Sequence, residues 1–253
     1  MTSTAQVSGK QSENLVHVLT ASGAVAGLVA LQNIIAGNVR TALIWLIICQ
    51  VLDGVDGPLA RKYRIDQNQG TFDGRVLDLV VDYVTCAVVP AVLFIHVNLV
   101  RQSLSVAVAG VILLTSALWF AKTDQESVDH WFSGFPASWN IVIPSMVILH
   151  ARESIVFLLV GFFCLLQMSN VKFPHVMKVV AMRRMTLLFT AVYFGCFVLL
   201  SVDYPNGPNW ARRVLLVAPI YLALLITWRT WRPTQKVLGR TILVDRNQQK
   251  SLP

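Results

Sequence analysis

The sequence predicts an all-α fold, a polytopic membrane bundle of about eight transmembrane helices. Hydrophobic residues make up 55% of the 253 residues, and the mean hydropathy is +0.60. Charged residues contribute only 13%, about half the usual share of a soluble domain. Several apolar runs reach the roughly 20 residues that a helix needs to cross a bilayer. In a membrane protein, a net charge of +8 suits contact with anionic lipid headgroups, and nothing in the distribution of the charges indicates a nucleic acid partner.

Eight apolar runs follow one another along the chain. The fifth and sixth are short and are separated only by Arg152 and its neighbours, so they form either a tight hairpin or a partly re-entrant pair. The first 13 residues are polar, and we expect them to be disordered. The runs are residues 14–37, 40–62, 75–99, 104–122, 136–151, 153–170, 185–202 and 213–230.

The lysines and arginines predict the orientation. With the N-terminus in the cytoplasm, 16 of the 21 fall on the cytoplasmic side. The five on the other side are Arg40, Arg101, Arg152, Arg212 and Arg213. This bias predicts that both termini are cytoplasmic.

Four aspartates lie at or inside the ends of two apolar runs: Asp53 and Asp56 in the second, Asp78 and Asp82 in the third. Each ionised side chain costs roughly 2.5–3.5 kcal/mol in hydrocarbon. Spacings of three and four residues place each pair on one helix face. If the two helices pack together, four hard oxygen ligands converge, as Mg²⁺ or Mn²⁺ requires. The alternative from another class is a cation or proton pathway in a transporter.

Small and basic residues accompany these carboxylates at fixed offsets. Gly57 and Ala60 share the face of the first pair, and Gly74 shares that of the second. They leave room for a bulky group against the backbone. Arg61 suits a phosphate. Metal, phosphate and a close pocket together indicate metal-assisted phosphoryl transfer.

Asp53 to Asp82 reads Asp-x-x-Asp-Gly-x-x-Ala-Arg, a spacer at residues 62–73, then Gly-x-x-x-Asp-x-x-x-Asp. This pattern resembles the signature of the CDP-alcohol phosphatidyltransferase family. The twelve-residue spacer is longer than in most of that family and resembles its bacterial phosphatidylcholine synthase branch. Residues 17–23, 134–140 and 172–175 are similar to that branch as well.

The resemblance implies transfer of the phosphatidyl group of CDP-diacylglycerol to choline, giving phosphatidylcholine and CMP. It further implies a homodimer in the bacterial inner membrane, with one catalytic domain at residues 14–230 and a basic cytoplasmic tail at 231–253. Another acceptor, such as serine, glycerol phosphate or inositol phosphate, remains an alternative. The resemblance also implies the roles of the motif residues. Asp53, Asp56 and Asp78 would bind two Mn²⁺ or Mg²⁺ ions, and Asp82 would share one ion and act as the base. Gly57, Ala60 and Gly74 would pack around the nucleotide, and Arg61 would contact phosphate.

Four further groups each allow two interpretations. Aromatic residues between 122 and 140 suit either a quaternary ammonium group or a membrane interface. Lys172, Lys178, Arg183 and Arg184 suit either phosphate or an ordinary cytoplasmic loop. His17, Thr20 and Ser22 form a polar face that lines the nucleotide pocket or, as we favour, hydrogen-bonds another helix. Asp73 is expected to be solvated or to cap a helix.

Overall fold

The structure is a computed structural model that describes residues 2–62, 72–123, 131–174 and 183–231. Helices dominate it, as predicted. In chain order the elements are α1 (Thr2–Ile35), α2 (Val39–Lys62), α3 (Gly74–Asp82), η2 (Tyr83–Val88), α4 (Val89–His96), α5 (Gln102–Phe120), β1 (Trp131–Ser133), α6 (Trp139–Ile148), α7 (Glu153–Gln167), β2 (Lys172–Pro174), α8 (Arg183–Val202) and α9 (Asn209–Trp231).

Within the described residues, six helices are long and apolar enough to cross a membrane. One of them is the continuous run α3–η2–α4, Gly74–His96. The two short runs of the sequence are also helices, α6 with 10 residues and α7 with 15. All eight predicted runs are therefore helical, and the chain is an all-α, multi-pass membrane protein by the length and composition of its helices.

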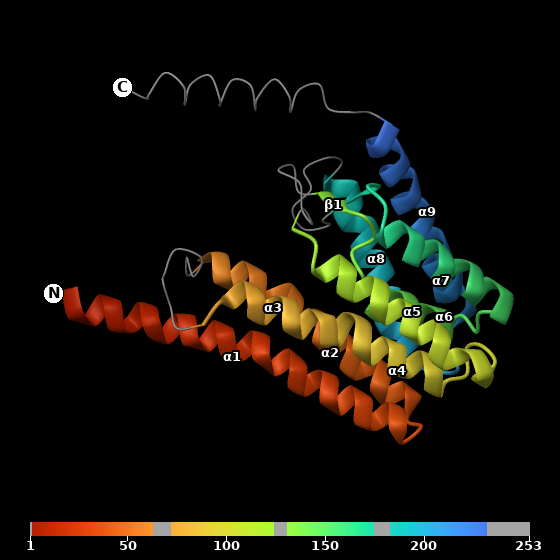
Figure 1. Cartoon of the computed structure of the whole chain (residues 1–253), viewed down its shortest axis with the longest axis horizontal. Coiled ribbons are helices and arrows are strands. Elements are labelled where there is room, and N and C mark those ends of the chain that lie inside the picture. The colour runs from red at the N-terminus through yellow and green to blue at the C-terminus, as the bar shows by residue number, and fades with distance from the viewer. Residues whose placement is uncertain (1, 63–71, 124–130, 175–182, 232–253) are drawn as a thin grey trace.

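Apolar side chains cover the outside of the bundle. Val25 is 62% exposed, Leu158 69% and Leu224 66%, which is what a lipid-facing surface requires. The interior is built around α4 and α6, where Phe94 and Trp139 are fully buried. In Figure 1, α1 to α4 run alongside one another, and α9 lies on the far side of the molecule from α1.

Small residues bring α1 close to the helix that carries two of the aspartates. A Cβ atom at Gly23 would lie 2.9 Å from Val81 Cγ1, and one at Gly27 would lie 3.4 Å from Thr85 Cγ2. Glycines at such points let two membrane helices approach closely. The position of α3 is thus fixed by its packing against α1.

The run α3–η2–α4 is not a uniform α-helix. Residues Tyr83–Val88 form a π-helical segment, and the N–H of Val89 donates to the carbonyl of Val84. Pro90 follows directly and has no N–H to donate, which disfavours regular α-helical bonding at this point. The wider turn begins immediately after Asp82.

Two features differ from the sequence-based expectations. The backbone of α1 begins at Thr2, so the expectation of disorder in the first 13 residues is wrong. No proline interrupts these polar residues, and they continue the helix of the apolar run. A short antiparallel pair, β1 with β2, was not predicted; it pairs Phe132 with Phe173 and closes the ends of the loops beside α6 and α7.

Candidate metal centre

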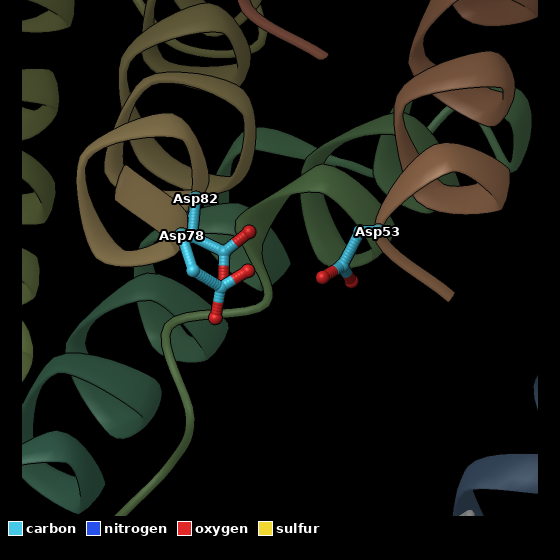
Figure 2. Close-up of side chains that lie close together, drawn as sticks. All are labelled: Asp53, Asp78 and Asp82. Atoms are coloured by element: carbon cyan, nitrogen blue, oxygen red, sulfur yellow. The ribbon is translucent and has the colours of Figure 1, made fainter. Parts of the chain in front are cut away.

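Three of the four predicted aspartates converge at one end of two facing helices. Asp53 comes from α2, and Asp78 and Asp82 come from successive turns of α3. One carboxylate oxygen of each lies within 4.8 Å of the others. Figure 2 shows Asp53 pointing across the space between the helices toward the other two. Asp53 is exposed and the other two are half-buried, so the group is open on one side.

Three carboxylates at this separation repel one another when ionised. For two unit charges 4.8 Å apart, the repulsion is about 3–4 kcal/mol at an effective dielectric constant of about 20. A divalent cation would turn this repulsion into attraction. Oxygen donors from carboxylates are what Mg²⁺ and Mn²⁺ prefer, so the residues present fit such an ion.

The fourth aspartate lies outside this group. Asp56 is 6% exposed, and its Oδ2 accepts a hydrogen bond of 2.8 Å from Thr20 Oγ1 on α1. This is the bond between helices that we favoured for the polar face of the first span. Ser22, from the same face, instead donates to the carbonyl of Leu19 within its own helix.

The small residues of the motif border the carboxylates. Gly57 and Ala60 lie half-buried in the last turns of α2. The backbone of Arg61 continues the same helix, but its side chain lies outside the described part of the structure. Gly74 is the first residue of α3.

The start of α3 explains two residues of the motif region. Asp73 caps the helix, accepting from the N–H groups of Arg75 and Val76, as expected for one of its two interpretations. A Cβ atom at Gly74 would lie 2.8 Å from Cε1 of His17. Glycine at this position therefore lets α3 pack closely against α1.

A second polar group lies one helical turn beyond the carboxylates and was not predicted. Gln50 Nε2 donates to the backbone oxygen of Asn140 at 3.0 Å, and Asn140 Nδ2 donates to Cys86 Sγ at 3.2 Å. Gln50 and Cys86 lie on the two helices that carry Asp53, Asp78 and Asp82, which we call the triad. The only hint in the sequence was that Asn140 ends the stretch 134–140.

The aromatic residues near this stretch do not form an open cage. Trp131, Phe135 and Trp139 are at most 5% exposed. Phe135 packs edge-on against Trp139, with ring centroids 5.5 Å apart, and the indole N–H of Trp139 donates to Ser116 Oγ. These side chains belong to the packed interior, and the acidic residues of the same loop, at 124–130, lie outside the described residues.

The predicted basic loop is only partly described. Lys172 Nζ donates to Ser133 Oγ at 3.3 Å, which ties β2 to β1. Arg184 is exposed. Lys178 and the side chain of Arg183 lie outside the described part of the chain, as does His175, the last residue of the stretch 172–175.

Together, the fold and the triad define a polytopic membrane protein with a carboxylate site suited to divalent cations and phosphate chemistry. The model of the CDP-alcohol phosphatidyltransferase family matches residues 13–231, and the chain belongs to this family. The family is divalent-metal dependent, in agreement with the carboxylate group.

Curated relatives are similar over most of their length. Each of the three described here is named phosphatidylcholine synthase. The one from Pseudomonas aeruginosa is 31% identical over 86% of this chain and 91% of its own. That from Borreliella burgdorferi is 30% identical over 86% of this chain and 94% of its own. The relative from Agrobacterium fabrum is 30% identical over 82% of this chain and 86% of its own.

Proposed function

We propose that this chain transfers the phosphatidyl group of CDP-diacylglycerol to choline, forming phosphatidylcholine and releasing CMP. The observation that carries the chemistry is the convergence of Asp53, Asp78 and Asp82 in a member of this family. The names of the relatives support choline as the acceptor. Family membership favours a transferase over the cation transporter that the sequence left open.

Asp53, Asp78 and Asp82 are the residues that would hold Mn²⁺ or Mg²⁺, and we propose two ions. Bound there, the ions would neutralise the charge of the diphosphate and of the departing CMP. Asp56 joins them in this proposal. Only its Oδ2 accepts from Thr20, and a carboxylate has acceptor capacity on both oxygens, so it can keep this bond and contribute a ligand oxygen.

Asp82 is the proposed base. It lies one turn farther along α3 than Asp78, which is about 6 Å along the axis, and it is half-buried. From there its carboxylate would accept the proton of the choline hydroxyl as the oxygen attacks phosphorus. A carboxylate is a weak base toward an alcohol, so positioning of the substrates must supply most of the rate.

The remaining motif residues would bind the nucleotide. Gly57 and Ala60 leave the surface of α2 low enough for the nucleotide to pack against it, and Gly74 shapes the same pocket. Arg61 contacts a phosphate. We assign residues 14–230 to one catalytic domain and residues 231–253 to a basic tail, of which 232–253 lie outside the described residues.

We also propose a homodimer in the bacterial inner membrane with both termini in the cytoplasm. The distribution of lysine and arginine supports this orientation. In a variant without the four native cysteines, a cysteine introduced at Gln67 should react with an impermeant thiol reagent in inverted vesicles. Reaction from outside intact cells would overturn the topology.

The activity is tested with purified protein, CDP-diacylglycerol, Mn²⁺ or Mg²⁺ and a panel of alcohols. We expect CMP release that depends on choline and on the metal, with phosphatidylcholine as the lipid product. A product made from serine, glycerol phosphate or inositol phosphate instead would reassign the acceptor. Failure to release CMP with any alcohol, combined with cation transport in vesicles, would establish the transporter.

A further inference from the structure

The polar group one turn beyond the triad has no role in the reaction described above. Gln50 precedes Asp53 by three residues on α2. Cys86 follows Asp82 by four residues on the continuous helix α3–η2–α4. Asn140, which is 5% exposed, lies in the first turn of α6 between them. Each of the two helices that carry carboxylates therefore has a polar residue directly beyond the triad, and Asn140 contacts both.

Asn140 joins the two helices through different atoms. Its backbone oxygen accepts from Gln50 Nε2 at 3.0 Å, and its side-chain Nδ2 donates to Cys86 Sγ at 3.2 Å. Amide groups in an apolar interior are costly to leave without partners, so each bond resists separation of its helix from α6. Asn140 on α6 thus links Gln50 on α2 to Cys86 on η2.

The helix that supplies the bridge is itself firmly held. Ser116 Oγ on α5 accepts from Trp139 Nε1 at 3.0 Å and from Gln167 Nε2 at 3.3 Å. The chain reaches α6 through Gly134, whose φ is +85°, and a Cβ atom there would lie 2.5 Å from the Gln167 carbonyl oxygen. These contacts hold the stretch 134–140 in place and therefore fix the position of Asn140.

We propose that Asn140 is a positioning residue that sets the separation between Asp53 on α2 and the Asp78–Asp82 pair on α3. Binding α2 and η2 to one point, a turn beyond the carboxylates, fixes how far apart their ends stand. A metal site tolerates ligand displacements of only about 0.5 Å, so this separation controls cation affinity. The inference rests on the proposed function, because a bound cation is what makes the separation matter.

The test is direct Mn²⁺ binding to the purified full-length protein, measured by electron paramagnetic resonance without substrates. Asn140→Ala should weaken binding about tenfold, in line with the loss of groups that orient metal ligands. Gln50→Met and Cys86→Ala should each lower the Mn²⁺ affinity as well. Cys86→Ser keeps an acceptor for the Asn140 amide and should lose less than Cys86→Ala.

Ser145→Ala is the matched control. Ser145 lies on the same helix α6, and its Oγ bonds the hydroxyl of Tyr193 on α8 at 2.8 Å, away from the triad. Its loss should lower the unfolding temperature without changing Mn²⁺ affinity. A double variant, Asn140→Ala with Cys86→Ala, should bind Mn²⁺ no more weakly than Asn140→Ala alone, because both changes break the same bond.

The outcomes separate the two proposals. If the unaltered protein binds no Mn²⁺, the proposed function fails, and this inference fails with it. Unchanged affinity in Asn140→Ala, when the unaltered protein does bind, overturns the inference alone. Should Asn140→Ala fail to fold, unchanged affinity in both Gln50→Met and Cys86→Ala overturns it equally.

Discussion

Replacing Gly74 by alanine tests whether close packing of α1 against α3 holds the triad in place. The new Cβ would lie 2.8 Å from Cε1 of His17, about 0.6 Å inside the 3.4 Å at which ordinary contact begins. The His17 ring is buried and packs edge-on against Phe72, with centroids 6.1 Å apart, so it has little room to withdraw. The start of α3 must then move away from α1.

The size of the effect follows from two opposing terms. Overpacking a tight interface costs about 1–3 kcal/mol. Alanine recovers less than the roughly 1 kcal/mol of helix propensity available in a helix interior, because Gly74 is the first residue of α3. We expect a net loss of about 1–2 kcal/mol in the free energy of unfolding. Mn²⁺ affinity should fall as well, since Asp78 lies one turn away.

The assay is thermal unfolding in detergent together with Mn²⁺ binding. Gly110→Ala, in α5, is the control, because no atom lies within 4 Å of the added Cβ. It should not destabilise the protein. Combining Gly74→Ala with His17→Ala should be less harmful than the two single effects added together, since the smaller side chain removes the overlap. Full additivity, or wild-type stability of Gly74→Ala, would refute the packing argument.

Three other predictions concern the aspartates of α3, Thr20 and Glu153. Asp82→Asn should keep most of the binding of Mn²⁺ and CDP-diacylglycerol, while turnover falls roughly 10²–10⁴-fold. Asp78→Asn should instead lose metal affinity together with turnover. Equal losses of metal affinity in titrations of the two variants would show that Asp82 is simply a ligand. Thr20→Val removes the donor to the buried fourth carboxylate and should lower stability by about 1.5–3 kcal/mol, while Thr20→Ser should not; thermal unfolding of both compares them. The pKa of exposed Glu153 is lowered chiefly by a hydrogen bond from the backbone N–H of Arg101, so that contact contributes at neutral pH and fades as pH falls through the lowered pKa. The side chain of Arg101 is 74% exposed and that of Glu153 is 38% exposed, so solvent screens the pair. Glu153→Gln should therefore change the unfolding temperature at neutral pH, and its dependence on pH, only slightly, and a large shift would contradict this.

Local sequence patterns were enough to predict the helices and the convergence of three of the four expected aspartates. Runs of apolar residues predict membrane helices directly, because the bilayer leaves few other solutions. Four-residue spacing placed Asp78 and Asp82 on one face, and the structure places them there with Asp53 opposite. These predictions depend only on the period of one helix and on two helices being neighbours.

Features that depend on a third element were not predictable in this way. Asp56 shares the spacing of Asp53, but its carboxylate lies against Thr20 because α1 packs beside α2. The bridge through Asn140 uses a backbone oxygen, which no residue type reveals. The strands β1 and β2 have three residues each and are separated by two helices, so neither has a pattern long enough to read.

The π-helical segment Tyr83–Val88 has a consequence for how this span tolerates insertions and deletions. Its wider turn holds about one residue more than an α-helical turn, which shifts the phase of everything beyond it by about 100°. Removing a single residue there would take away the extra residue of the wider turn and leave the apolar composition of the span almost unchanged. If the carboxylates of α3 then kept their present orientation, the buried face of α4 would turn away from the helices that it now packs against, and the reverse would also hold. The length of this segment is therefore constrained far more tightly than its hydrophobicity.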